Sequence, residues 1–146
     1  MKLRKAFNSI PAPGRARLHF MIAALIMMIF VGTAIAGGLS TISPRQANVL
    51  IQQEKDNPDF VIIDIRTPGE FKSGHIKGAV LLDYYSKDFK KNMQALDKNK
   101  TYLIYCRSAN RSARTLSLIK DMGFRSIYNM DQGLIGWGKN GFTVVK

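Results

Sequence analysis

Apolar side chains recur along the chain in two patterns, and each pattern predicts a different kind of element. Continuous apolar runs rich in β-branched and aromatic residues are typical of strands buried on both faces. They occupy residues 60–65, 79–82, 101–106 and 126–130. Apolar residues spaced three or four positions apart predict helices instead. These lie at residues 44–56, 86–96 and 110–122, with a shorter helical turn at 133–138.

Residues that begin or end helices support these boundaries. Ser43 is a good N-cap, Pro44 suits the first helical position, and Gln46 follows the cap by three residues. Pro58 ends that helix, and Gly123 closes the helix at 110–122. Because strands alternate with helices, we expect an α/β domain whose parallel sheet is covered by helices on both faces.

The N-terminal part of the chain has a composition of its own. It opens with five Lys or Arg and no acidic residue, and residues 20–36 form an uncharged run that ends in Ala34-Ile35-Ala36. This pattern is typical of a secretory signal, and we favour cleavage after Ala36. The alternative is an uncleaved anchor within residues 18–36. Three segments are expected: an export segment at 1–36, a linker at 37–42 and one domain at 43–146.

The charge before the apolar run also predicts a compartment. Positive residues hold the N-terminus inside, so residues 37–146 are expected to be periplasmic or otherwise extracytoplasmic, whether free or anchored to the inner membrane. The whole chain carries a net charge of +12, of which residues 37–146 hold +7, from seventeen bases and ten acids. No basic run is interleaved with aromatic residues, so no nucleic acid is expected as a partner. The sequence contains no Cys/His set, P-loop or paired carboxylates, so no metal and no cofactor are expected.

The only cysteine, Cys106, is the last residue of the strand predicted at 101–106, and a helix is predicted to begin at residue 110. In parallel sheets, ligands bind beyond the carboxyl ends of the strands, where loops lead into helices. The small polar run at 107–110 can curl so that its N–H groups converge, and the helix N-terminus adds further donors. Arg107, Arg111 and Arg114 add positive charge. These features predict a thiolate with a lowered pKa in an anion cradle, and the alternative is a buried, inert thiol.

Three blocks of the sequence resemble the signatures of rhodanese-family sulfurtransferases. CRSANRS at 106–112 resembles the family's active-site loop, and DIRTPGEFKSGHIKGAV at 64–80 resembles its D-x-R and G-H-I-x-G-A signature. MGFRSIYNMDQGLIGWGKNGFTV at 122–144 resembles its closing segment. The blocks occur in the family's order and together span most of residues 43–146, which makes the resemblance specific.

The resemblance implies an enzyme that moves sulfane sulfur and a parallel sheet of about five strands. Cys106 would take sulfur from an anionic donor such as thiosulfate and carry it as a persulfide to cyanide or to a thiol, which a protein could supply. The implied substrate-binding residues are Arg107, Ser108, Ala109, Asn110, Arg111 and Ser112. Arg107 and Arg111 would supply the charge, and the backbone N–H groups would hold the persulfide. Ala109 stands where many members have glycine.

Four residues of the second block are expected to support the site without taking part in the chemistry. Asp64 and Arg66 end a strand beside the active edge, and Arg66 is predicted to pair with Glu70 across the turn. His75, between Gly74 and a hydrophobic residue, is predicted to be a hydrogen-bonded structural histidine.

Other functions remain open for such a loop. A non-catalytic binding or sensing module of the same fold is one alternative. A cysteine phosphatase needs five residues between cysteine and arginine, whereas four separate Cys106 from Arg111 here. An arsenate reductase usually requires further cysteines. The shorter loop therefore favours sulfur as the group transferred.

Overall fold

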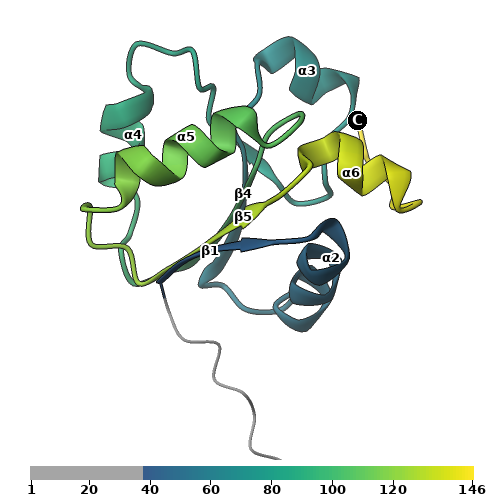
Figure 1. The fold of residues 1–146 in the computed structure, drawn as a ribbon, viewed down its shortest axis with the longest axis horizontal. Helices are drawn as coiled ribbons and strands as arrows, with labels where there is room; N and C mark the ends of the chain where they lie inside the picture. Colours follow the sequence, from purple (N-terminus) through teal and green to yellow (C-terminus); the bar gives the residue numbers. More distant parts are fainter. Residues whose placement is uncertain (1–37) are drawn as a thin grey trace, which may run out of the picture. The chain divides into compact units, whose positions relative to one another are not determined.

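The computed structural model describes residues 38–146, and the predicted export segment lies outside them. They form a five-stranded sheet in the order β1-β5-β4-β2-β3, with every neighbouring pair parallel (Figure 1). In chain order the elements are β1 (Gly38–Ile42), α2 (Pro44–Gln53), β2 (Phe60–Asp64), α3 (Pro68–Ser73), β3 (Val80–Leu81), α4 (Phe89–Ala95), β4 (Thr101–Tyr105), α5 (Asn110–Ile119), β5 (Ser126–Met130) and α6 (Gly133–Lys139). The predicted α/β class is confirmed.

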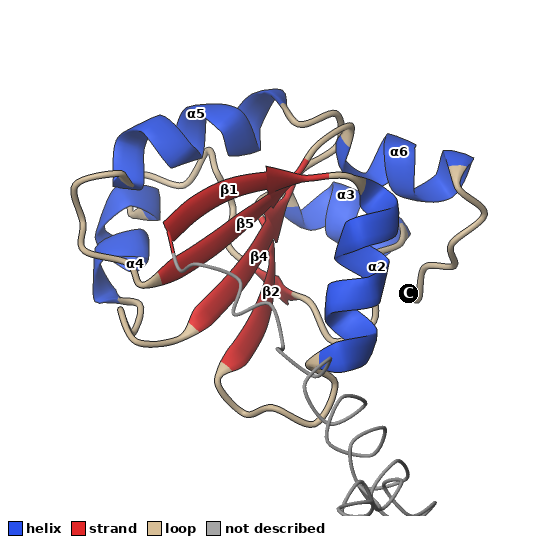
Figure 2. Ribbon diagram, turned by 60° about the horizontal axis from the view of Figure 1, so that its bottom comes forward, coloured by secondary structure: helices blue, strands red, loops and turns tan. Residues whose placement is uncertain are grey.

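Helices cover both faces of the sheet, α4 and α5 on one face and α2 and α6 on the other (Figure 2). The central strand β4 supplies both hydrophobic cores because its side chains alternate between the faces. Tyr102 and Ile104 pack under α4 and α5, whereas Leu103 and Tyr105 pack under α2 and α6. Trp137 of α6 is buried in the second core.

Most differences between the predicted and the observed ends of helices and strands are small, and they follow from local hydrogen bonding. The helix predicted at 110–122 ends at Ile119, because the next residues form a turn in which Met122 N–H donates to the Ile119 carbonyl. The helix predicted at 86–96 begins only at Phe89, after a turn closed by Phe89 N–H and the Ser86 carbonyl. No helix between residues 38 and 146 is long and apolar enough to cross a bilayer.

Two elements were not predicted. Helix α3 occupies part of a segment expected to be only a turn-rich connection; Thr67 and Glu70 form a capping box at its start. The linker predicted at 37–42 is wrong from Gly38 onward, because that stretch is the edge strand β1 and pairs with β5 over its full length. A five-residue strand with few apolar side chains gives no clear signal in the sequence.

Candidate active site

The candidate site lies at the carboxyl edge of the sheet, where β4 leads through a short loop into α5 (Figure 1). Cys106 is the first residue after β4, and α5 begins at Asn110. Ala109 lies between them with a φ of 71°, in the left-handed region. For a residue other than glycine this conformation costs about 1–2 kcal/mol. The turn that it makes curls the loop back around the cysteine sulfur.

The curled loop surrounds the sulfur with hydrogen-bond donors. Burial raises the pKa of the Cys106 thiol, but N–H groups of Ser112, Ser108 and Arg111 and the Ser112 hydroxyl outweigh burial and lower the pKa below its ordinary value. The Ser112 oxygen lies 3.6 Å from Cys106 Sγ. The direction agrees with the thiolate predicted from the sequence. The residue itself is only 1% exposed, so the sulfur sits at the bottom of the cradle.

Two carbonyl groups of the loop are held by backbone N–H groups of α6. Leu134 N–H donates to the Cys106 carbonyl at 2.8 Å, and Ile135 N–H donates to the Arg107 carbonyl at 3.0 Å. Gly133 makes this approach possible, because a Cβ there would lie 2.4 Å from the Cys106 carbonyl oxygen. The loop is thus bound to α6 through its carbonyls, whereas its N–H groups act on the sulfur. The sequence reasoning missed this role, although the glycines of the closing block were a signal.

Arg111 is bound to a carboxylate of α3. Its two terminal nitrogens donate to the two carboxylate oxygens of Glu70 at 2.9 and 2.8 Å. Arg111 holds the pKa of Glu70 at about 2, with help from Thr67, against the effect of burial. The same ion pair raises the pKa of Arg111. The structure therefore places Arg111 beside the cradle, where it ties α5 to α3 through paired charges.

The predicted pairing of Arg66 with Glu70 is wrong. Arg66 folds back on Asp64, two residues earlier, with Nη2 at 2.6 Å from Oδ2, and the same nitrogen donates to the Gly74 carbonyl. Both side chains are almost fully buried. Glu70 instead pairs with Arg111 of α5. The Asp64–Arg66 pair thereby fixes the segment that follows α3.

The remaining residues of the predicted cradle divide by exposure. Arg107, Ser108 and Asn110 are exposed, and Ser112 is fully buried. Arg107 makes no ion pair with the described residues 38–146. The structure thus gathers the whole 106–112 stretch around one sulfur atom, with an exposed rim and a buried floor.

His75 connects α3 with the C-terminal segment. Its Nδ1 lies 3.1 Å from the Phe71 carbonyl, its ring stacks on Phe71, and its backbone N–H donates to the Val145 carbonyl. Tyr105, the last residue of β4, accepts a hydrogen bond from Ile76 N–H, and burial raises the pKa of its hydroxyl. These contacts hold the segment that follows α3 against β4 and the C-terminal segment.

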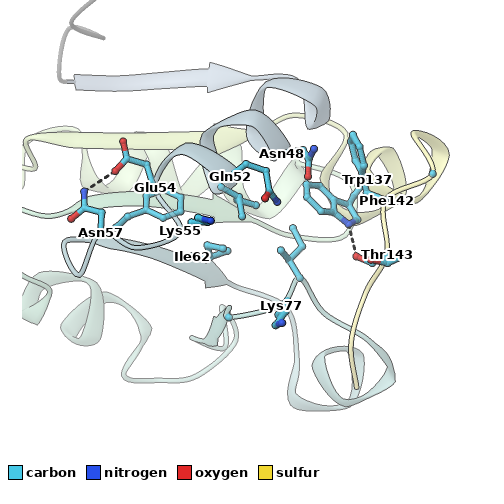
Figure 3. A pocket seen from close by; sticks show the side chains of 15 residues that line it. Asn48, Gln52, Glu54, Lys55, Asn57, Ile62, Lys77, Trp137, Phe142 and Thr143 are labelled. Atoms are coloured by element: carbon cyan, nitrogen blue, oxygen red, sulfur yellow. Dashed lines mark hydrogen bonds between the residues drawn. The ribbon is translucent and has the colours of Figure 1, made fainter. Parts of the chain in front are cut away.

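A surface cavity of about 730 Å³ lies away from the cysteine loop, on the face of the sheet covered by α2 and α6 (Figure 3). One side of α2, together with Ile62 and Trp137, lines it, and no residue of the 106–112 stretch does. The Cys106 loop, and not this cavity, is therefore the candidate site. Among residues 38–146, no three His, Cys, Asp or Glu side chains are grouped to hold a metal ion.

Comparison with known proteins points to one family. The profile of the Rhodanese-like domain matches residues 47–140. A sulfurtransferase from Allochromatium vinosum is 31% identical over 96 residues, covering 66% of this chain and 88% of that protein. A thiosulfate sulfurtransferase from Pseudomonas entomophila is 34% identical over 97 residues, covering 66% of this chain and 82% of that protein.

Some relatives are much longer than this chain. The match covers 25% of a probable adenylyltransferase/sulfurtransferase from Mycobacterium tuberculosis. Among solved structures, a rhodanese-related protein from Thermoplasma volcanium has a TM-score of 0.60 at 21% identity, with 73% of this chain and 97% of that chain covered. At that identity the structural likeness establishes the fold alone.

Proposed function

This chain belongs to the rhodanese-like domain family, and we propose that it transfers sulfane sulfur through a persulfide on Cys106. One observation carries the proposal: the Cys106 sulfur lies inside a ring of N–H and hydroxyl donors that lower its pKa. Such a ring favours an anionic sulfur, whether it is the thiolate before reaction or the persulfide after it.

In the first step, the Cys106 thiolate attacks the outer sulfur of an anionic donor, for which thiosulfate is the simplest example. A bond forms between Sγ and the outer sulfur, the sulfur–sulfur bond of the donor breaks, and sulfite leaves with the electron pair. The charge before and after the step is the same, and no external oxidant or reductant is needed. The loop N–H groups stabilise negative charge as it moves to the terminal sulfur.

In the second step, a nucleophilic acceptor attacks the terminal sulfur. The bond between that sulfur and Sγ breaks, and Cys106 returns as a thiolate held by the same donors. Cyanide would leave as thiocyanate, and a thiol would leave as a persulfide. The exposed Arg107 at the rim is positioned to attract an anionic donor.

Phosphate transfer is disfavoured by the same geometry. Four residues separate Cys106 from Arg111, which makes a loop smaller than a tetrahedral phosphate requires. Both terminal nitrogens of Arg111 also bind Glu70, so the charge of this arginine is already balanced by a carboxylate. Transfer of a single sulfur atom does not need the larger loop.

We also propose that the domain works outside the cytoplasm. The basic start and the uncharged run at residues 20–36 support export. The intact mass of the protein recovered from a bacterial host would distinguish cleavage after Ala36 from an uncleaved anchor.

The test of the catalytic proposal is a mass measurement on the full chain after incubation with thiosulfate. We expect a gain of one sulfur atom, its loss on addition of cyanide, and no gain in Cys106→Ser. If neither thiosulfate nor a small organic persulfide loads the protein, the proposal is wrong and the domain is a binding module.

A further inference from the structure

The surface around the Cys106 loop has features that a small acceptor such as cyanide would not need. Cys106 is 1% exposed, whereas Arg107, Ser108 and Asn110 around it are exposed. A persulfide would carry the reactive sulfur about 2 Å farther out, toward this rim. An acceptor must therefore reach the sulfur across these exposed residues and their neighbours, the rim. The residues of the rim determine which acceptors bind there.

Two large apolar side chains lie exposed on the rim. Tyr85 is 68% exposed, and its ring centroid lies 5.7 Å from Arg111 Cζ. Ile135 is 43% exposed, and its own N–H donates to the Arg107 carbonyl. A single exposed apolar side chain is ordinary, but Tyr85 and Ile135 each contact the same stretch, residues 106–112. Exposed apolar groups beside a reactive centre are typical of protein contact surfaces.

The rim is also positively charged. The stretches that carry the rim residues, 83–88, 106–114 and 133–139, contain three arginines, two lysines and two acidic residues, Asp83 and Asp88, so the balance is positive. Glu70 is the carboxylate that reaches the loop from α3, and Arg111 neutralises it. Arg107 and Arg114 are exposed and make no ion pair among the described residues. A surface of this kind is complementary to an acidic partner.

We propose that the sulfur acceptor is a protein thiol on an acidic segment that also carries an apolar side chain, and that it docks on Tyr85, Arg107, Arg114 and Ile135. The inference rests on the proposed function, because it names the acceptor of the same persulfide. Tyr85 and Ile135 would contact the apolar side chain, and the two arginines would attract the acidic residues.

The transfer needs no further reactant. The partner's thiolate attacks the terminal sulfur of the Cys106 persulfide, the bond to Sγ breaks, and Sγ leaves with the electron pair. One persulfide and one thiolate give one persulfide and one thiolate, so charge and oxidation state balance. The loop N–H groups hold the departing Cys106 thiolate.

The test compares acceptors on the full-length protein loaded with thiosulfate. Three cysteine peptides of equal length are offered, with the cysteine flanked by Glu and Leu, by Lys and Leu, or by Gln and Ser, and cyanide serves as the small acceptor. Loss of the persulfide is followed by intact mass. We expect the Glu/Leu peptide to react about tenfold faster than the Lys/Leu peptide at low salt, with the difference shrinking at high salt.

Matched variants connect this preference to the rim. Tyr85→Ser, Ile135→Ser and Arg114→Gln should each reduce the Glu/Leu rate about threefold or more, which is about 0.7 kcal/mol, while the cyanide rate stays within about twofold. Val49→Ser on α2 and Arg125→Gln before β5, both exposed and far from the loop, should change neither rate.

The outcomes separate the two proposals. Equal rates for the acidic and basic peptides, or a preference that the rim variants leave intact, would overturn the docking inference while the persulfide chemistry stands. A protein that takes up no sulfur overturns both.

Discussion

At the scale of single residues, the Ser112 hydroxyl has one hydrogen and two possible acceptors for it, the Ala109 carbonyl and the Cys106 sulfur. Its oxygen lies 3.1 Å from the Ala109 carbonyl oxygen and 3.6 Å from Cys106 Sγ. Only one of these hydrogen bonds can form at a time. A thiolate or persulfide is the stronger acceptor, so the hydroxyl is expected to turn to the sulfur when the sulfur is charged.

We therefore predict that Ser112→Ala raises the pKa of the Cys106 thiol. Below neutral pH, alkylation of Cys106 and sulfur uptake from thiosulfate should each slow by about fivefold, the equivalent of one hydrogen bond of about 1 kcal/mol. The pH profile of iodoacetamide alkylation measures the pKa of Cys106, and the mass assay with thiosulfate measures sulfur uptake. Ser108→Ala is the control, since Ser108 contributes only its backbone N–H to the sulfur. Equal profiles for the two variants would remove the role assigned to the Ser112 hydroxyl.

At the scale of elements, the first turn of α6 sets the orientation of the Cys106 loop. Gly133 has a φ of 53°, and any Cβ there would collide with the backbone of Cys106 and Arg107. Gly133→Ala should lower the free energy of unfolding by about 1–3 kcal/mol and slow sulfur uptake, because α6 must move away from the carbonyls that it holds. Denaturant titration and the mass assay measure these effects. Gly138→Ala, in the same helix with open space around it, should leave both nearly unchanged or stabilise the helix.

The contact between α3 and α5 depends on pH through Glu70. Its pKa is about 2 in the folded protein and 4.5 ordinarily, so its contribution to stability is complete above pH 4.5 and is lost as the pH falls toward 2. Glu70→Gln should lower the free energy of unfolding at neutral pH by about 1 kcal/mol, since the pair is partly exposed. The difference from the parent protein should vanish near pH 2. Asp56→Asn, at a 90% exposed side chain, should produce a much smaller difference in denaturant titrations at both pH values.

The same elements show how far the sequence could be interpreted. The buried strands and the helix after Cys106 have strong apolar patterns and caps, and the sequence predicted their positions to within three residues. Helix α3 has only six residues and no apolar stripe, so the pattern missed it. The partner of Arg66 could not be predicted either, because Asp64 and Glu70 are both within reach in the sequence and only the direction of α3 separates them.

At the scale of the whole molecule, the edge strand β1 connects the sheet to the site. It pairs with β5, and the Ile42 carbonyl at its end accepts a hydrogen bond from Asp131 N–H at 2.9 Å, just before the turn into α6. Leu39 packs against the core under α4 and α5, and Ile42 packs against the core under α2 and α6. The strand therefore contributes to both cores and to the position of α6.

This connection predicts where the independently folding unit begins. A chain of residues 37–146 should unfold cooperatively and take up sulfur, whereas a chain of residues 43–146 should lose at least about 2 kcal/mol of unfolding free energy, the value of burying one large aliphatic side chain. It should also load sulfur more slowly at temperatures where it is still folded, because α6 loses the contact that positions its first turn. Thermal unfolding followed by circular dichroism, together with the mass assay, measures both effects. Equal stability and equal uptake in the two chains would mean that β1 is dispensable and that the domain begins at Ser43.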